Sequence, residues 1–322
     1  MNDTKSPMSC SSAVVITGAS SGIGRATAMS LADAGYLVFA GVRRPSDGEK
    51  LQALSSGVVR PLILDVTDAG SVAAAASKVA TVVGSAGIQG LINNAGIGFV
   101  GPMEAVPLDA LRRLYEVNVF GQVAVLQAFL PVLRQGGGRL INIGSIGDRL
   151  TPPYTGPLSS SKQAFASITD ALRLELRSSG IRVVLIEPAA IRTEAIDKVE
   201  DQAEDLIGEM SSANRDRYAA SFLKMTRRGL ARERAGSSPD RVAAVIEKAL
   251  TAPNPKARYL VGRDSRRMAL LARWMPVPIL DRIMLRVLGL STGPDHNSEL
   301  SESSGAIAQL GSDKSALIGG RS

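Results

Sequence analysis

Short β-rich apolar runs alternate with longer helical patterns from Ala13 to Ile186, and this alternation constrains the fold more than any other feature of the sequence. Alternating strands and helices imply right-handed crossovers between parallel strands, and therefore a doubly wound sheet. The sequence predicts an α/β fold with about seven parallel strands. The predicted strands are Val14–Thr17, Leu37–Val42, Val59–Leu64, Leu91–Asn93, Arg139–Ile143, Val183–Ile186 and Ala257–Val261. The predicted helices are Arg25–Ala34, Ser71–Val83, Leu108–Leu133, Ser159–Ser178 and Pro239–Leu250.

Segments without this alternation flank or interrupt a single main domain over residues 13–262. We expect a flexible N-terminus over residues 1–12 and, because residues 291–322 are rich in Ser and Gly, a disordered tail there. A charged, helical-looking insertion over residues 193–237 is interpreted as a substrate lid, with a solvated helical face as the alternative. Residues 263–290 predict an amphipathic C-terminal extension in which Pro276 and Pro278 interrupt any helix.

Composition excludes several kinds of site and partner. One cysteine, Cys10, excludes an internal disulfide framework, and one histidine, His296, removes His-cluster metal sites, so no metal is expected. The net charge of +7 comes without a recognised nucleic-acid motif, which argues against a nucleic-acid partner. The polar start Met1–Ser12 lacks the apolar run of a signal peptide, which predicts a cytoplasmic protein. Residues 268–290 suit either peripheral membrane contact or packing against another subunit.

The string Thr17–Gly24 stands between the first predicted strand and the first predicted helix. Its glycines allow close approach to the backbone, and the helix N-terminus presents unpaired N–H groups and the positive end of a dipole. In this context the string predicts a pyrophosphate-binding loop. The candidate binding residues in it are Gly18, Ser20, Ser21, Gly22, Ile23 and Gly24.

The Gly-x-x-x-Gly-x-Gly spacing of this loop resembles the short-chain dehydrogenase/reductase family, nearest in appearance to its steroid and retinol dehydrogenase branch, and implies a Rossmann-like sheet. The resemblance covers about Ala13–Val261. Its further matches are Asp65, Asn93-Asn94-Ala95-Gly96, Asn118, Ser145, Lys162, Pro188 and Thr193.

The resemblance assigns a cofactor contact to many of these residues. It implies that Asp65, beside Val66, binds the adenine amino group, and that Asn94, Ala95 and Gly96 shape the sheet end beside the cofactor. It also implies that Lys162 grips the nicotinamide ribose, and that Pro188 and Thr193 lie beside the nicotinamide carboxamide. Ala189 stands where the family usually has glycine, which puts the conformation of that loop in question.

The choice between NADP and NAD is decided at the end of the second predicted strand. A carboxylate there would bind the ribose 2′-hydroxyl of NAD and repel a 2′-phosphate. Arg43 and Arg44 occupy this point instead, and their forked N–H donors suit phosphate. The sequence therefore favours NADP over NAD, with Arg43 the better candidate; the alternative is that both arginines are ordinary exposed loop charges.

The catalytic group of the family is matched except at one position. The resemblance implies that Ser145 orients the substrate oxygen, that Asn118 holds a proton-relay water, and that Lys162 lowers the pKa of a tyrosine one helical turn before it. That tyrosine position is Leu158, thirteen residues after Ser145 as in the family. Leucine has no exchangeable proton, and the loss of a general acid typically costs about 10²–10⁴ in rate. Tyr154 lies in a proline-rich loop, where it is expected to line the substrate pocket.

Two functions remain open from the sequence. The first is an NADP-dependent oxidoreductase that moves a hydride between the nicotinamide and a carbonyl or secondary alcohol, with an apolar, steroid- or retinoid-like substrate suggested by the resemblance and activity impaired by Leu158. The second is an NADP-binding relative without turnover that acts as a sensor or interaction protein. The resemblance also implies a homodimer or homotetramer assembled through the helices that carry Asn118 and Lys162.

Overall fold

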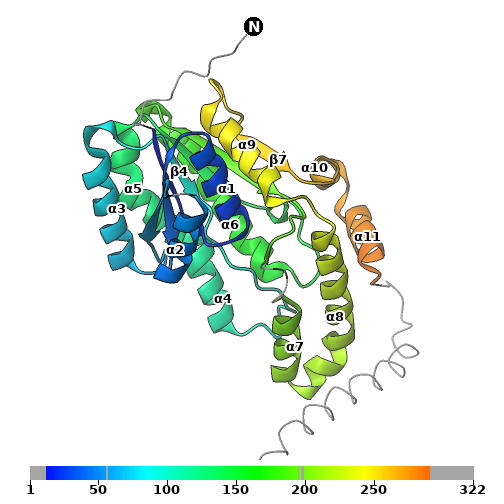
Figure 1. Cartoon of the computed structure of the whole chain (residues 1–322). Helices are drawn as coiled ribbons and strands as arrows, with labels where there is room; N and C mark the ends of the chain where they lie inside the picture. The colour runs from blue at the N-terminus through cyan, green and yellow to red at the C-terminus, as the bar shows by residue number, and fades with distance from the viewer. Residues whose placement is uncertain (1–11, 56, 195, 197–198, 291–322) are drawn as a thin grey trace, which may run out of the picture.

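The computed structural model describes residues 12–290 apart from 56, 195, 197 and 198 (Figure 1). The expected flexible N-terminus, except Ser12, and the expected tail over residues 291–322 lie outside the described residues, as do Cys10 and His296.

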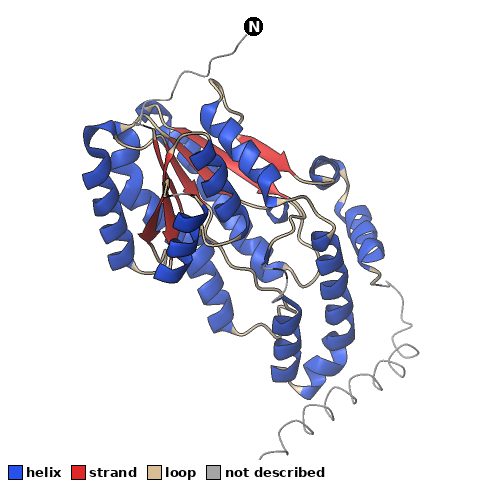
Figure 2. Ribbon diagram, viewed as in Figure 1, coloured by secondary structure: helices blue, strands red, loops and turns tan. Residues whose placement is uncertain are grey.

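A parallel sheet of seven strands forms the centre of the molecule (Figure 2). The strands are β1 (Ala13–Ile16), β2 (Leu37–Val42), β3 (Val59–Ile63), β4 (Gly90–Asn93), β5 (Arg139–Ile143), β6 (Arg182–Pro188) and β7 (Arg258–Val261). Their order is β3-β2-β1-β4-β5-β6-β7, and every neighbouring pair is parallel. The fold class predicted from the sequence is thereby confirmed. The chain reverses its direction of growth between β1 and β4, where a doubly wound sheet opens a crevice at the carboxyl ends of its strands.

Helices cover both faces of this sheet. The helices of the main alternation are α1 (Gly22–Asp33), α2 (Pro45–Leu54), α3 (Ala69–Val83), α4 (Leu108–Tyr115), α5 (Gly121–Gln135), α6 (Gly156–Glu175) and α9 (Pro239–Thr251). Short 3₁₀ turns follow at Gly84–Ala86, Ile146–Asp148 and Leu176–Ser179.

Alternate residues of β1 supply the two apolar cores. Val14 and Ile16 pack with side chains of α1 and α9, whereas Ala13 and Val15 pack with side chains of α3 and α5. All four are buried, which explains why the strand reads as a continuous apolar run instead of an alternating one. Two helical stretches, Ala69–Ala86 and Leu108–Gln135, are long and apolar enough to cross a membrane. Both contribute to the second core, through Val79 and Phe129 respectively.

The predicted helix Leu108–Leu133 is interrupted. A π-helical turn over Glu116–Phe120 separates α4 from α5. Such a turn frees a carbonyl from the ordinary helical ladder, and here the Gln122 side-chain amide donates to Val117 O at 3.1 Å. Gly121 follows at once, because a Cβ there would stand 2.8 Å from Val66 O. Sequence periodicity does not reveal a one-residue insertion of this kind.

One short helix was not predicted from the sequence. Helix α2 begins with Pro45 in its first turn and carries Asp47 there, both of which are helix-start signals. Its low apolar content hid it, because only Gly48 and Leu51 are buried.

The insertion between Thr193 and Ser237 is helical, as expected. It consists of α7 (Val199–Glu209) and α8 (Ser212–Arg234), and a parallel bridge between Ile191 and Ser237 closes its base. Their inner faces form a separate apolar cluster around Phe222 and Met225.

Beyond β7, the extension folds into α10 (Ser265–Trp274) and α11 (Val277–Leu288), on the outside of the molecule (Figure 1). The expectation that Pro276 and Pro278 interrupt any helix is half right. Pro276 separates the two helices, but Pro278 lies in the first turn of α11, where a proline is tolerated.

Candidate functional site

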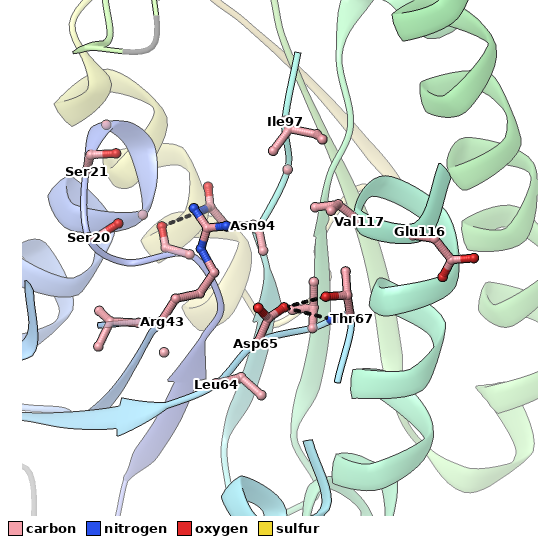
Figure 3. Close-up of a pocket in the computed structure, with 18 of the residues that line it drawn as sticks. Ser20, Ser21, Arg43, Leu64, Asp65, Thr67, Asn94, Ile97, Glu116 and Val117 are labelled. Carbon is pink, nitrogen blue, oxygen red and sulfur yellow. Dashed lines mark hydrogen bonds between the residues drawn. The ribbon is translucent and has the colours of Figure 1, made fainter. Parts of the chain in front are cut away.

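A cleft of about 970 Å³ opens at the carboxyl ends of β1, β2, β3 and β4, where the strand order reverses. Figure 3 shows the side chains that converge on it. Most of the predicted cofactor residues line this cleft: Gly18, Ser20, Ser21, Gly22, Ile23, Gly24, Arg43, Asp65, Val66, Asn94, Ala95, Gly96 and Thr193. Three predicted cofactor residues, Arg44, Lys162 and Pro188, are not part of its described lining.

The loop Gly18–Gly24 is packed so tightly that side chains cannot replace its glycines. Gly18 and Gly22 have positive φ angles of 64° and 53°. A Cβ on Gly24 would stand 2.2 Å from Gly18 O and 2.5 Å from Asn94 Nδ2. Ser21 precedes α1 without a side-chain capping bond, so the N–H groups of the first turn face the cleft as anion-binding donors.

Hydrogen bonds fix this loop to the end of β4. The Thr17 hydroxyl accepts from Asn94 N and Ala95 N, both at 2.9 Å. The Asn94 amide in return donates to Thr17 O at 2.9 Å and to Gly18 O at 3.0 Å. The two strand ends at the switch point are therefore held as one rigid unit.

The two arginines after β2 occupy different positions. Arg43 lines the cleft and reaches between the loop of Ser20 and Ser21 and the strand end of Asp65 (Figure 3). Arg44 has a side chain 78% exposed and its Nε lies 3.2 Å from Asp47 Oδ2. Arg43, the better candidate from the sequence, is thus the one in the cleft wall.

Asp65 is held ionised with one oxygen already engaged. Its Oδ1 accepts from Thr67 N at 3.0 Å and from the Thr67 hydroxyl at 2.8 Å. The backbone hydrogen bond from Thr67 is the main cause that lowers the pKa of Asp65, and the charges of Arg43 and Arg113 act in the same direction. Asp65 therefore offers a carboxylate oxygen to an N–H donor in the cleft.

Sequence reasoning missed the opposite wall of the cleft. It is formed by α4 and the π-helical turn, and its residues are Asp109, Ala110, Arg113, Glu116 and Val117. No motif marks these residues, and only the packing of α4 against the sheet end brings them to the cleft. Other lining residues that the sequence did not single out are Gly41, Val42, Leu64, Thr67 and Ile97.

Pro188 ends β6 and Thr193 lies five residues later, and the two side chains have different surroundings. Pro188 is buried in the sheet opposite Val261, and Ala189 N donates to Val261 O at 2.8 Å. Thr193 instead faces the glycine loop, because its Cγ2 would lie 3.3 Å from a Cβ on Gly22.

Ser145 and Lys162 both lie near the carboxyl end of β5. Ser145 Oγ accepts from Gly147 N at 3.1 Å at the start of a 3₁₀ turn. Lys162, on α6, donates from Nζ to Ile143 O at 3.1 Å, two residues before Ser145. Desolvation lowers the pKa of Lys162 to about 8, against the opposing charge of Asp148.

The Asn118 side chain is committed to the framework. Its Oδ1 accepts from Ile97 N at 2.9 Å, while its Nδ2 donates to Ile97 O at 3.0 Å and to Ser161 Oγ at 3.1 Å. It thereby ties the loop after β4 to α6. Because both polar atoms of the Asn118 side chain are engaged in these bonds, its role in a proton relay stays a prediction.

Leu158 lies in the first turn of α6, one turn before Lys162 and on the same helix face. It is partly buried, and its carbonyl accepts from the Ser161 hydroxyl. Leu158 and Lys162 thus lie four residues apart on α6, and the assignment of Leu158 to the tyrosine position stays a prediction.

Tyr154 lies between the turn after β5 and helix α8. Its φ of 67° is in the left-handed region, and its hydroxyl is 2.7 Å from Ser221 Oγ of α8. Its ring meets Phe222 edge-on, with the ring centroids 5.5 Å apart. The structure therefore places Tyr154 in the apolar cluster under α7 and α8, with its hydroxyl engaged.

A buried cluster of charges lies behind Ser145 and Lys162. Glu187 Oε1 accepts from Arg149 Nε at 2.8 Å and from Arg258 Nη1 at 2.9 Å. Arg258 also donates to Asp148 Oδ2 at 3.1 Å. The Asp148 side chain is 1% exposed. Burial raises the pKa of Asp148 to about 7, and the neighbouring Glu187 adds to the effect.

The comparisons with known proteins agree with this geometry. The short chain dehydrogenase family matches residues 12–204, and the chain belongs to that family of oxidoreductases. It is 34% identical to retinol dehydrogenase 5 of Homo sapiens over 89% of this chain and 92% of that protein, which confirms the resemblance to the retinol dehydrogenase branch. It is 35% identical to an NADPH-dependent 3-dehydrocapnine reductase of Ornithobacterium rhinotracheale over 85% of this chain and 96% of that protein.

Among solved structures, the chain is similar to a short chain dehydrogenase from Burkholderia cenocepacia J2315 in complex with NADP. The TM-score is 0.64 at 26% identity, and the match covers 85% of this chain and 97% of that one.

The Asp148 carboxyl makes folding stability depend on pH. Its raised pKa means that the folded chain binds a proton between about pH 4 and 7 that the unfolded chain has lost, so this group's contribution to stability falls as pH rises. Between pH 5 and pH 8, the parent should lose on the order of 2 kcal/mol more free energy of unfolding than the Asp148→Asn variant. Urea denaturation at both pH values measures this, with the exposed Asp33→Asn as control. Equal changes in parent and Asp148→Asn would contradict it.

Proposed function

We propose that this protein is an NADP-dependent oxidoreductase that transfers a hydride between the nicotinamide and a carbonyl or secondary alcohol of an apolar, steroid- or retinoid-like compound. The observation that carries the proposal is the cleft itself. A glycine loop and helix N-terminus, an arginine at the end of β2 and a carboxylate at the end of β3 line one cavity. Ser145 and Lys162 lie at the end of β5 near this cavity. Leu158 lowers the rate of this activity.

The residues present fit a bound dinucleotide. Gly18 and Gly22 have positive φ angles, and a Cβ on Gly22 would lie 3.3 Å from Thr193. The loop of these glycines therefore leaves room for a pyrophosphate at the start of α1. Asp65 would accept from the adenine amino group and Arg43 would pair with a 2′-phosphate. Lys162 would hold the nicotinamide ribose, and Pro188 and Thr193 would border the carboxamide. When bound, the cofactor supplies the hydride.

The chain's own residues orient the substrate. Ser145 would donate to the substrate oxygen, which polarises a carbonyl and fixes its position relative to the cleft. Asn118, including the backbone around it, would hold a relay water. Tyr154 would line the substrate pocket, and its bond to Ser221 would hold α8 against the loop before α6.

The preference for NADP rests on Arg43 and on the absence of a carboxylate from the described lining around it, Gly41–Arg43. Two of the similar proteins are named with this cofactor, one as NADPH-dependent and one in complex with NADP.

One observation favours a second function. Leu158 removes the proton donor while the binding residues around the cleft are intact, which is the pattern of an NADP-binding sensor or interaction protein without turnover. The two functions differ in one measurable property, since only the first predicts oxidation of bound NADPH by a ketone.

The Leu158→Tyr variant tests the proposed activity. Because a phenol restores the missing acid one turn before Lys162, the rate of ketone reduction should rise by about 10²–10⁴ while NADPH affinity stays within a few-fold of the parent value. NADPH fluorescence measures binding, and loss of its absorbance over a panel of apolar ketones and aldehydes measures turnover. Absence of NADPH binding in both proteins would refute the proposal. Binding by both with turnover by the variant alone would favour the second function.

Arg43→Ala tests cofactor choice. Loss of a guanidinium–phosphate interaction should weaken NADPH binding by about 10–100-fold, at roughly 1.5–3 kcal/mol for a charged hydrogen bond, and leave NADH binding nearly unchanged. Arg44→Ala is the matched control, because the Arg44 side chain points to Asp47. Equal losses in the two variants, or equal losses for NADPH and NADH, would argue against the assigned role.

We further propose a cytoplasmic protein that attaches peripherally to anionic membranes through α10 and α11. Support comes from exposed apolar side chains beside basic ones: Leu270, Trp274, Val277, Ile279 and Val287 are exposed by 43–70%. Residues 263–290 contain six arginines against two acids. An apolar face bordered by cations suits the interface of an anionic bilayer.

Trp274 is the single tryptophan of the chain and reports on this contact directly. Vesicles with anionic lipid should shift its fluorescence to the blue, and Val277→Glu should weaken binding several-fold. Leu54→Glu, at an equally exposed leucine of α2, is the control. No shift with anionic vesicles would refute the membrane proposal.

In solution we propose a homodimer or homotetramer through α5 and α6, beside whose surfaces Phe120 and Leu174 are exposed by 57% and 62%. Light scattering measures the mass, and a monomer at every concentration would contradict this assembly.

A further inference from the structure

The proposed reduction needs a proton donor, and Leu158 has no proton to give. Reduction of a carbonyl adds a hydride at carbon and a proton at oxygen, and the family's phenol is missing here. The following inference rests on the proposed function and names the acid that serves that same site.

Lys162 lies between the cleft and the carboxyl end of β5. Its Nζ would lie 3.7 Å from a Cβ on Gly96, a residue that lines the cleft. On its other side it donates to Ile143 O, at the strand end that leads into Ser145. The ammonium thus stands between the cleft and the residue that orients the substrate oxygen.

The ammonium also has donors to spare. It carries three N–H groups, and among the described residues Ile143 O is its one hydrogen-bond partner. Where a tyrosine would take a second hydrogen bond, Leu158 offers an aliphatic side chain. A substrate oxygen, directly or through one water, would accept from one of the remaining N–H groups.

Other candidate acids are poorer. The Tyr154 hydroxyl lies in the lid cluster, bonded to Ser221. The Ser159 hydroxyl is buried against Thr155 and is a far weaker acid than an ammonium. The Asp148 carboxyl is enclosed behind the site, beside Arg258 and Glu187.

We propose that the Lys162 ammonium is the acid that protonates the substrate oxygen in this protein, and that Asp148 is a positioning residue that supports the ammonium charge. In ketone reduction, the carbonyl carbon receives a hydride from NADPH and the C–O π pair becomes an oxygen lone pair. That oxygen takes a proton from Nζ as the N–H bond breaks. The products are a secondary alcohol, NADP⁺ and a neutral amine, which solvent reprotonates.

The surroundings of Lys162 suit this chemistry. Burial makes the ammonium more acidic than a surface lysine, which brings it close to the pH range where a general acid works best. Asp148, from the turn after Ser145, is the ionisable group whose charge reaches it among the described residues. Asp148 in turn faces Glu187 of β6 and Arg258 of β7, with Arg149 beside it.

Lys162→Arg separates proton donation from cofactor holding. Arginine can still donate hydrogen bonds to a ribose, but its guanidinium does not give up a proton. NADPH affinity should stay within about threefold, whereas ketone reduction should fall by about 10²–10⁴. In the Leu158→Tyr background, Lys162→Arg should cost less than about tenfold, because the phenol then donates the proton.

A second readout needs neither cofactor nor turnover. Trace acetylation of the cofactor-free protein with acetic anhydride, quantified by mass spectrometry, gives the titration midpoint of Lys162, with the exposed Lys78 as internal standard. The midpoint should lie near pH 8 and match the pH above which ketone reduction declines in the parent. Asp148→Asn should move both downward together, since it removes a carboxylate that favours the ammonium.

The outcomes distinguish the inference from the function on which it rests. Failure of parent and Leu158→Tyr to bind NADPH overturns both. NADPH binding by the parent without ketone reduction overturns the role of Lys162, and turnover by Leu158→Tyr in the same assay would favour the second function. A Lys162→Arg variant that keeps parent turnover overturns the role of Lys162 while the proposed oxidoreductase function stands. An ordinary lysine midpoint in the acetylation experiment overturns it as well.

Discussion

The site depends on the close approach of two strand ends at the point where the sheet order reverses. Gly24 can lie against Gly18 O and the Asn94 amide only because it has no side chain, and Thr17 and Asn94 exchange hydrogen bonds across the same gap. This contact sets the direction of α1 relative to the sheet, and thereby the place where its N-terminal N–H groups point. The positions of Arg43 and Asp65 depend on the same contact, because these residues follow β2 and β3, the next two strands outward from β1.

On the other side of the switch point, buried polar groups hold neighbouring elements together. Asn118 joins the loop after β4 to α6, and the charge cluster of Asp148, Glu187 and Arg258 joins the turn after β5 to β6 and β7. Buried charges of this kind are costly unless each has partners, and here two arginines share two carboxylates. Lys162 is desolvated in this arrangement, and its pKa is therefore lower than that of a surface lysine.

Much of this architecture could be predicted from the sequence. The seven strands were placed within a few residues because strands buried on both faces, such as Ala13–Ile16, read as plain apolar runs. The glycine loop, Asp65 and Arg43 could be placed at one edge of the sheet because each comes directly after a predicted strand, and parallel strands have their carboxyl ends at the same edge. The α4 wall with Arg113, and the cluster around Asp148, were missed because packing over long sequence distances assembles them. Lys162 was recognised, but its desolvation was not, since burial of an ammonium is a property of the fold.

The strained Tyr154 links the loop before α6 to helix α8. Its φ of 67° fixes the loop that leads into α6, while its hydroxyl meets Ser221 and Gly101 N donates to its carbonyl at 2.7 Å. Helix α8 is also held to the loop before α4, where the Tyr218 hydroxyl and Arg217 both donate to Glu104. Outward movement of α8 must break the Tyr154–Ser221 bond or carry this loop with it. Movement of α8 and the conformation of the loop that leads into α6, the helix of Leu158 and Lys162, are therefore coupled.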